Sequence, residues 1–231
     1  MTMPGSQISA KWANEYSREG IPSSYRSRPS NSLLEFLRFL SLHNIAPAAA
    51  VDIGCGAGRN TLELARRQIS VVGFDIVESC IAELNEAAQR ESLKSWARGV
   101  CTDATLDWPC ETSSKDIAID CFCFKHIIDP TGSAAYANNL ARVLRPGGYF
   151  MMSCASASDG YYGSLPALPA DGPGKLIIDP GNNIASRLYE TEDLVRLFPM
   201  LTLDKVLVRN SRNKMHGHEY QRCTLVAYFR R

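Results

Sequence analysis

Apolar residues form short, nearly continuous runs from Ala48 onward, and segments with helical periodicity separate these runs. Runs of this length and composition predict buried strands. The predicted strands are residues 48–53, 69–75, 95–101, 116–122 and 148–154. The predicted helices between them are residues 59–68, about 78–91 and about 132–144. Repeated strand–helix units with apolar strands indicate a parallel sheet that helices cover on both faces.

The pattern resumes near the end of the chain with the short capped helix TEDLVRLFP and two more apolar runs, LTLDKVLVR and QRCTLVAYFR. The segment between these two strands is too short for a crossover helix, so we expect them to be antiparallel. The chain is thus predicted to be an α/β protein. Its fold is expected to be Rossmann-like, with a seven-stranded, mostly parallel sheet, helices on both faces and an antiparallel last strand.

Two segments depart from this alternation. Residues 1–46 contain aromatic, Arg, Ser and Pro residues, followed by the amphipathic helix NSLLEFLRFLSLHN, which Asn31 or Ser32 is expected to cap. We expect residues 1–46 to form an N-terminal helical lid segment and residues 47–231 to form the main domain. Residues 155–185 are rich in Gly, Pro, Ser and Asp without periodicity, which predicts a long functional or mobile loop.

Composition narrows the possible partners. The 231 residues suffice for one sizeable core. The 25 basic and 24 acidic residues give a net charge of +1, so nothing in the charge balance indicates nucleic acid or a membrane surface.

No apolar run suggests a secretory signal or a membrane span, and a cytoplasmic location is expected. The eight cysteines form no CxxC pair and the four histidines supply no matching motif, so we predict reduced thiols and no metal site.

The stretch VDIGCGAGRN places Gly54, Gly56 and Gly58 at alternate positions between a predicted strand and a predicted helix. Backbone N–H groups at such a junction can bind a nucleotide-like ligand. The dinucleotide fingerprint G-x-G-x-x-G/A requires a small residue where this chain has Arg59, and it asks for no acid at Asp52. The nucleoside pattern D/E-x-G-x-G-x-G fits every position.

Three further stretches follow in order, namely VVGFDI with Asp75 at the end of the second strand, CTDAT with Asp103 after the third strand, and VLRPGGYF before the fifth. With these motifs the chain, from about Ala48 to its C-terminus, resembles the class I S-adenosylmethionine-dependent methyltransferases. The glycine stretch is similar to that of the small-molecule branch, which includes tellurite-resistance-type enzymes. The resemblance implies S-adenosyl-L-methionine as the cofactor.

The resemblance also implies roles for individual residues. Asp52 would organise the amine side of the cofactor, Asp75 would accept hydrogen bonds from both ribose hydroxyls, and Asp103 would accept one from the adenine amine. The alternative for each carboxylate is a turn or cap residue. The residues of the N-terminal segment themselves suggest that Trp12, Tyr16 and Tyr25 cover the site and that Arg26 or Arg28 pairs with the cofactor carboxylate; the alternative is simple packing. The expected cofactor-binding residues are Asp52, Gly54, Gly56, Gly58, Asn60, Asp75, Ile76, Asp103, Ala104, Cys121, Tyr16, Tyr25 and Arg28.

The stretch CFCFKHIIDP after the fourth strand contains His126, whose ordinary pKa suits a general base. The alternative is a histidine that only packs there. An Asn-Pro-Pro-Tyr motif is absent, so the resemblance favours a small-molecule acceptor over a nucleic-acid base or a glutamine amide. The turn SRNKMHGHEYQR either lines the acceptor site or is an exposed hairpin tip.

Three functions remain open from the sequence. The first is methyl transfer to a small molecule. The second is attack at the aminopropyl carbon of S-adenosylmethionine, for example cyclisation to azetidine-2-carboxylate with release of methylthioadenosine. The third is a non-catalytic cofactor-binding protein. The sequence identifies neither the acceptor nor the oligomeric state.

Overall fold

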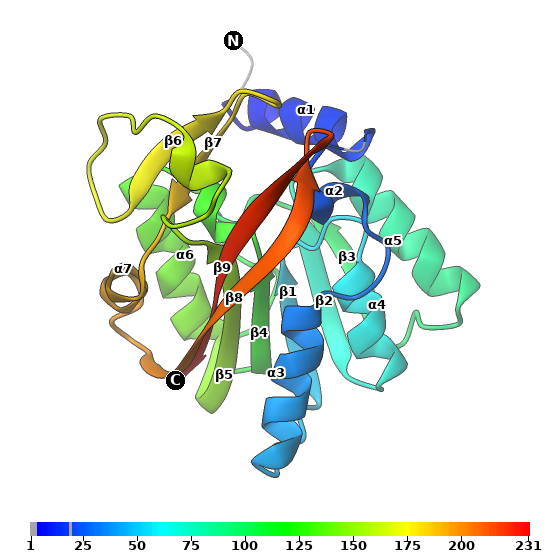
Figure 1. The fold of residues 1–231 in the computed structure, drawn as a ribbon. Coiled ribbons are helices and arrows are strands. Elements are labelled where there is room, and N and C mark those ends of the chain that lie inside the picture. Colours follow the sequence, from blue (N-terminus) through cyan, green and yellow to red (C-terminus); the bar gives the residue numbers. More distant parts are fainter. Residues whose placement is uncertain (1–3, 19) are drawn as a thin grey trace.

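A seven-stranded sheet forms the centre of the protein (Figure 1). The computed structural model describes residues 4–18 and 20–231, apart from the side chains of residues 4–6 and 25. The strand order is β3-β2-β1-β4-β5-β9-β8. The strands are β1 (Ala49–Ile53), β2 (Ser70–Asp75), β3 (Ala97–Cys101), β4 (Lys115–Cys121), β5 (Leu144–Ala155), β8 (Thr202–Met215) and β9 (His218–Arg230). Strands β1–β5 pair in parallel, whereas β9 runs antiparallel to both β5 and β8. The predicted fold class is confirmed.

Helices cover the two faces of the sheet and bury a separate core on each. The helices are α3 (Asn31–Leu42), α4 (Arg59–Arg66), α5 (Glu78–Arg90), α6 (Pro130–Val143) and α7 (Thr191–Leu197). Helices α3, α4 and α5 pack with Ile117 and Ile119 of β4, whereas α6 and α7 pack with Ala118 of the same strand. This alternation follows from the two-residue period of a strand. It explains why these strands are apolar at nearly every position.

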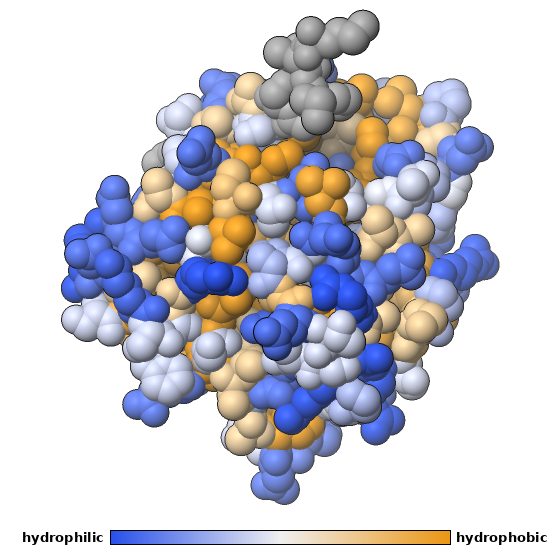
Figure 2. All heavy atoms as spheres, turned by 180° about the vertical axis from the view of Figure 1, so that it is seen from behind, coloured by the Kyte–Doolittle hydropathy of each residue, from blue (hydrophilic) through white to orange (hydrophobic). Residues whose placement is uncertain are grey.

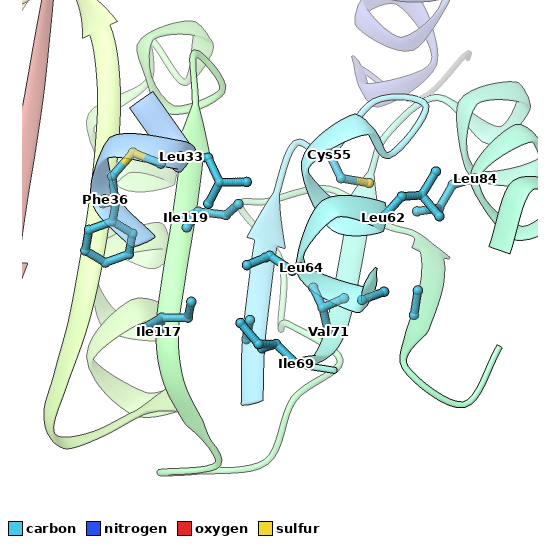
Figure 3. Close-up of a cluster of buried hydrophobic side chains, with 14 of the residues drawn as sticks. Leu33, Phe36, Cys55, Leu62, Leu64, Ile69, Val71, Leu84, Ile117 and Ile119 are labelled. Carbon is cyan, nitrogen blue, oxygen red and sulfur yellow. The ribbon is translucent and has the colours of Figure 1, made fainter. Parts of the chain in front are cut away.

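Figure 3 shows the first of these cores. Leu33 and Phe36 of α3 point toward Ile117 and Ile119 of β4, and Leu62 of α4 lies beside Leu84 of α5. Because α3 contributes to the same core as the sheet, it is an integral layer of the domain.

Helix α3 begins one residue earlier than the sequence indicated. Its N-cap is Ser30, whose hydroxyl accepts a hydrogen bond from the Leu33 N–H, and neither Asn31 nor Ser32 has this role. Ser30 is extended, as an N-cap residue must be, and its short hydroxyl satisfies a donor of the first turn. Several adjacent polar residues could each have served as the cap, so their pattern did not separate them.

The segment at 155–185 contains regular structure that the sequence did not indicate. Strands β6 (Lys175–Asp179) and β7 (Ile184–Leu188) form a separate antiparallel pair, and a short 3-10 helix, η2, covers Tyr162–Ser164. The long-loop prediction is therefore wrong for the second half of this segment. The Gly- and Pro-rich residues before β6 dominated its composition and obscured two five-residue strands.

The two last strands also extend further than predicted and meet in a tight turn. His216 and Gly217 both have positive φ angles, of 47° and 85°. Turns with two such residues match the twist of a hairpin and allow full pairing up to the tip. Met215 therefore pairs with His218, and β8 and β9 form one long hairpin.

The part of the N-terminal segment before α3 lies across the edge of the sheet where the parallel strands end. It contains helices α1 (Pro4–Tyr16) and α2 (Pro22–Tyr25), and Figure 1 shows α1 beside the β8–β9 hairpin tip and the β6–β7 pair. Within the described residues, no helix combines the length and apolar character needed to cross a membrane.

We predict that Phe36→Ala lowers the free energy of unfolding by about 3–5 kcal/mol, because the removed ring leaves a cavity in a close-packed core. Phe36 is fully buried and its ring centroid lies 4.9 Å from that of Tyr228. The matched control is Leu42→Ala on the same helix, where the side chain is 71% exposed and little change is expected. Urea titrations measure the free energy of unfolding of both variants. An equal decrease in Phe36→Ala and Leu42→Ala would contradict the assignment of α3 to the core.

Candidate functional site

The glycine turn joins β1 to α4 through a backbone that suits glycine. Gly54, Gly56 and Gly58 all have positive φ angles, of 65°, 54° and 84°. A Cβ on Gly54 would lie 2.4 Å from the Cβ of Cys123, and one on Gly56 would lie 2.7 Å from the Tyr16 hydroxyl. The missing side chains therefore serve two purposes: they permit the left-handed conformation, and they let two other segments approach the turn.

A cavity of about 510 Å³ lies against this turn, at the carboxyl ends of β1, β2, β3 and β4. Open α/β sheets bind ligands at this edge. The predicted site residues on its wall are Tyr16, Gly54, Asn60, Asp75, Ile76, Asp103, Ala104, Cys121 and His126. Further wall residues include Ile8, Trp12, Ser23, Thr102, Thr105, Phe122, Cys123, Asp129 and Ala185. Seen from behind, hydrophobic surface is concentrated near the edge where the N-terminal segment lies (Figure 2).

Asp75 is the last residue of β2, and its carboxylate ties two loops together. One oxygen accepts a hydrogen bond from the Gly56 N–H at 2.9 Å, and the other accepts one from the Val77 N–H at 3.0 Å. Burial raises the pKa of this carboxyl group, and the two N–H donors oppose that shift. Asp75 thus fixes the glycine turn against the end of β2 while lining the cavity.

Asp103 and Ala104 occupy the loop after β3. Oδ1 of Asp103 accepts hydrogen bonds from the backbone N–H and the hydroxyl of Thr105, both at 2.8 Å. The Ala104 carbonyl accepts a hydrogen bond from the indole N–H of Trp108 at 2.9 Å. These bonds give the loop a defined shape, which places both residues on the cavity wall.

Asp52 lies behind the turn, outside the cavity wall. It is buried, and its Oδ2 accepts a hydrogen bond from the Thr61 hydroxyl at 2.6 Å, which links β1 to α4. Burial raises its pKa to about 6, although the Thr61 hydrogen bond opposes this shift. In this structure the Asp52 carboxylate therefore supports the glycine turn from the side away from the cavity, by linking β1 to α4.

The other predicted cofactor residues divide into three groups. Gly56 and Gly58 belong to the turn but do not line the cavity. Arg28 lines a neighbouring cavity instead. The side chain of Tyr25 lies outside the described residues.

The loop after β4 is held by Asp120, a residue that sequence analysis did not select. Its carboxylate accepts hydrogen bonds from the N–H groups of Cys123 and Phe124, at 2.8 and 2.9 Å, and from the Tyr136 hydroxyl at 2.8 Å. Phe122 within this loop has a φ angle of 73°, a conformation that is rare for a bulky residue and often marks a functional site. No sequence pattern indicated that backbone conformation.

His126 ends the short 3-10 helix η1 (Phe124–His126) and lines the cavity. Its Nδ1 lies 3.0 Å from the Ala185 carbonyl oxygen, which requires that Nδ1 carry the proton of a neutral ring. Nε2 has no hydrogen-bond partner among the described residues, and the ring packs edge-on against Trp12 at 4.6 Å. Burial, with a contribution from Lys125, lowers the pKa of His126 well below its ordinary value. The ring is therefore uncharged, with Nε2 as an acceptor.

The N-terminal segment is attached to residues that are distant in the sequence. The Ser9 hydroxyl donates to the Ile76 carbonyl at 2.9 Å, and Lys11 donates to the Asn183 carbonyl at 2.7 Å. The His216 N–H donates to the Gly20 carbonyl at 3.1 Å. These contacts hold α1 against the cavity, the start of α5, the β6–β7 turn and the hairpin tip.

Comparison with known proteins agrees with this geometry. Residues 50–148 match the model of a protein family described as a methyltransferase domain. The matched stretch contains the glycine turn, Asp75 and Asp103. The resemblance inferred from the motifs is thereby confirmed.

One curated relative matches about half of this chain. A ubiquinone biosynthesis O-methyltransferase of Methylococcus capsulatus is 27% identical over 123 residues, which are 53% of this chain and 50% of that protein. The match thus spans about half the length of that curated relative.

Two solved structures show the same fold. An S-adenosylmethionine-dependent methyltransferase of Methanosarcina mazei has a TM-score of 0.67 at 23% identity, covering 83% of this chain and 96% of its own. A 1,6-didemethyltoxoflavin-N1-methyltransferase of Burkholderia thailandensis, with its substrate and S-adenosylhomocysteine bound, has a TM-score of 0.65 at 22% identity. It covers 100% of this chain and 92% of its own.

We predict that Asp52→Asn changes the pH dependence of stability. Because burial raises the folded-state pKa to about 6, the contribution of Asp52 to stability is present below about pH 4 and is lost as the pH rises through 6. Asparagine does not ionise and can still accept the Thr61 hydrogen bond. The variant should therefore gain stability relative to the native protein between pH 4 and 7, by up to about 3 kcal/mol.

Urea titrations at several pH values, without ligand, measure this gain. The control is Asp171→Asn, which changes an exposed carboxylate outside the cavity wall. Parallel stability curves for the native protein and Asp52→Asn would contradict the inferred pKa.

Proposed function

We propose that this protein transfers the methyl group of S-adenosyl-L-methionine to a small-molecule acceptor. The observation that carries the proposal is the cavity at the glycine turn, whose wall brings together carboxylates from the ends of β2 and β3. The methyltransferase domain match and the relatives that methylate small molecules support the same activity.

The residues present fit an adenosine-bearing cofactor. Asp75 offers a carboxylate for the ribose hydroxyls, and Asp103 lies one strand further along for the adenine amine. Gly54 lies on the cavity wall, and its missing side chain lets Cys123 pack against the turn beside it. Tyr16, Asn60 and Cys121 would surround the amino-acid end of the cofactor, and Asp52 would act from behind the turn.

The bound cofactor supplies a methyl group on a positively charged sulfur, which an acceptor attacks in line. This chain would contribute mainly alignment and the exclusion of water, because a fixed near-attack geometry is worth many orders of magnitude in rate. Trp12 and Tyr16 from α1 line the cavity, and aromatic rings suit a cationic sulfur.

We further propose that His126 contacts the acceptor. Its Nε2 would accept a hydrogen bond from the attacking group, while the bond from Nδ1–H to the Ala185 carbonyl fixes the ring. The lowered pKa makes His126 a weak base, so proton removal would add less to the rate than alignment does.

The direct test incubates the pure protein with S-adenosylmethionine, alone and with candidate acceptors, and identifies the by-product by mass spectrometry. S-adenosylhomocysteine formed only with an acceptor would support methyl transfer. Methylthioadenosine would show the aminopropyl chemistry instead. Tight S-adenosylhomocysteine binding without any turnover across the acceptor set would favour a non-catalytic role, and binding of NAD in its place would refute the cofactor assignment.

We predict that Asp75→Ala weakens S-adenosylhomocysteine binding by roughly 2–4 kcal/mol, because two ribose hydroxyls lose a charged acceptor. Calorimetry measures the change, and circular dichroism verifies the fold. Glu83→Ala, an exposed carboxylate on α5, is the matched control and should bind normally. Unchanged affinity in Asp75→Ala would remove this residue from the proposed site.

We propose that the lid consists of α1 and α2, since α3 belongs to the core of the domain. Removing residues 1–26 spares the Ser30 cap and both large cores, so the truncated protein should fold. Cofactor affinity should fall and turnover should fall further, because alignment and water exclusion both suffer.

Trp12→Ala tests the same idea with a smaller change. It should lower turnover, whereas Trp96→Ala, a tryptophan outside the cavity wall, should not. A truncated protein with full activity would disprove the lid, and an unfolded one would show that the segment is structural.

A further inference from the structure

A second cavity of about 570 Å³ adjoins the first. Ser23, Arg59 and Phe122 line both cavities, so the two spaces share a wall at the glycine turn and the loop after β4. The rest of the second wall comes from residues 21–35, from η1 and η2, and from the β8–β9 hairpin.

This second cavity concentrates positive charge. Seven basic side chains line it against one acidic side chain, Glu35, although the whole chain has nearly equal numbers of both. The basic residues are Arg26, Arg28, Arg59, Lys125, Arg209, Arg212 and Arg222. Like charges that share one cavity repel each other, and a cleft lined by one sign of charge attracts the opposite sign.

Only two of the seven have a carboxylate partner within the described part of the chain. Arg209 pairs with Glu35 at 2.8 Å, and Arg222 pairs with Asp159 at 2.8 Å. The other five make no ion pair with a described residue. An anionic ligand would therefore find several cations that the protein does not already neutralise.

Lys125 is the most unusual member of the set. Its side chain is only 1% exposed, and its ammonium nitrogen has no hydrogen-bond partner among the described residues. The nitrogen lies 3.9 Å from the ring centroid of Tyr162, another residue of the cavity wall. A buried, unpartnered amine costs free energy, and a ligand that accepts its hydrogen bonds would explain why the fold retains it. Burial lowers the pKa of Lys125 to about 7, and Arg222 adds to this shift.

We propose that the second cavity binds an anionic group, a carboxylate or a phosphate, on the methyl acceptor. This inference rests on the proposed function. The cofactor also carries a carboxylate, but Arg59 would pair with it in place of the expected Arg28, because Arg59 lines both cavities and Arg28 lines only the second. The remaining cations line only the second cavity, so their combined charge is directed at a second ligand.

The test titrates the full-length protein, saturated with S-adenosylhomocysteine, with benzoate, phenyl phosphate and two neutral analogues, benzamide and phenol. Calorimetry should show that at least one anion binds at least ten times more tightly than its neutral analogue. Comparing benzoate with phenyl phosphate identifies which anionic group the cavity prefers. Raising the salt concentration should weaken this binding, because exposed charges are screened.

Two variants locate the binding. Arg212→Gln and Lys125→Met should each weaken binding of the preferred anion at least five-fold while changing S-adenosylhomocysteine affinity less than two-fold. Arg212 is exposed on β8, so its replacement leaves the fold intact even if Lys125→Met does not fold. Arg90→Gln, on the exposed face of α5 outside both cavities, is the matched control and should bind as the native protein does.

Several outcomes would overturn the inference. For the native protein, they are equal binding of anions and neutral analogues, or no anion binding at all. For Arg212→Gln, they are unchanged anion binding or a loss of S-adenosylhomocysteine affinity. The last result would assign the cavity to the cofactor carboxylate. If the native protein fails to bind S-adenosylhomocysteine, the proposed function fails. The same titration without it then decides separately whether the cavity binds anions.

Discussion

The close packing around the glycine turn is the constraint on which the cavity depends. Because Gly54 and Gly56 lack side chains, the loop after β4 and helix α1 can both approach the same short stretch of backbone. Asp75 holds this stretch from a third direction through the Gly56 N–H. Any larger residue at either glycine would push one neighbour away, and the wall of the cavity would open.

Much of the framework was predictable because it depends on local patterns. The apolar runs located the strands of the sheet, and the carboxyl ends of parallel strands meet at one edge. Asp75 and Asp103 were therefore expected near each other, and both line the cavity. Asp52 shows the limit of that reasoning, since it lies one residue before the end of β1 and points toward Thr61 behind the turn. Alternation along a strand decides that direction, but the motif alone does not reveal it.

The remainder depends on contacts between distant segments. Ala185 joins the site through the carbonyl that receives the Nδ1–H of His126, and nothing in the surrounding sequence marks it. The positive φ angle of Phe122 occurs where the Asp120 carboxylate accepts hydrogen bonds from the N–H groups of Cys123 and Phe124, the two residues after Phe122. The charge of the second cavity was hidden because its arginines come from the N-terminal segment, from the start of α4 and from the β8–β9 hairpin, and only the fold brings them together.

The attachments of helix α1 have a consequence for biogenesis. Lys11 of α1 donates to the carbonyl of Asn183, and the nearby Gly20 carbonyl accepts from the N–H of His216, so α1 depends on segments that are synthesised well after it. Contacts so far apart in sequence form late, because closing a long loop costs entropy before any contact repays it. Strands β1–β5 would therefore pair before α1 is attached beside the cavity. Helix α1 would take its place beside the cavity only after Asn183 and His216 have been synthesised.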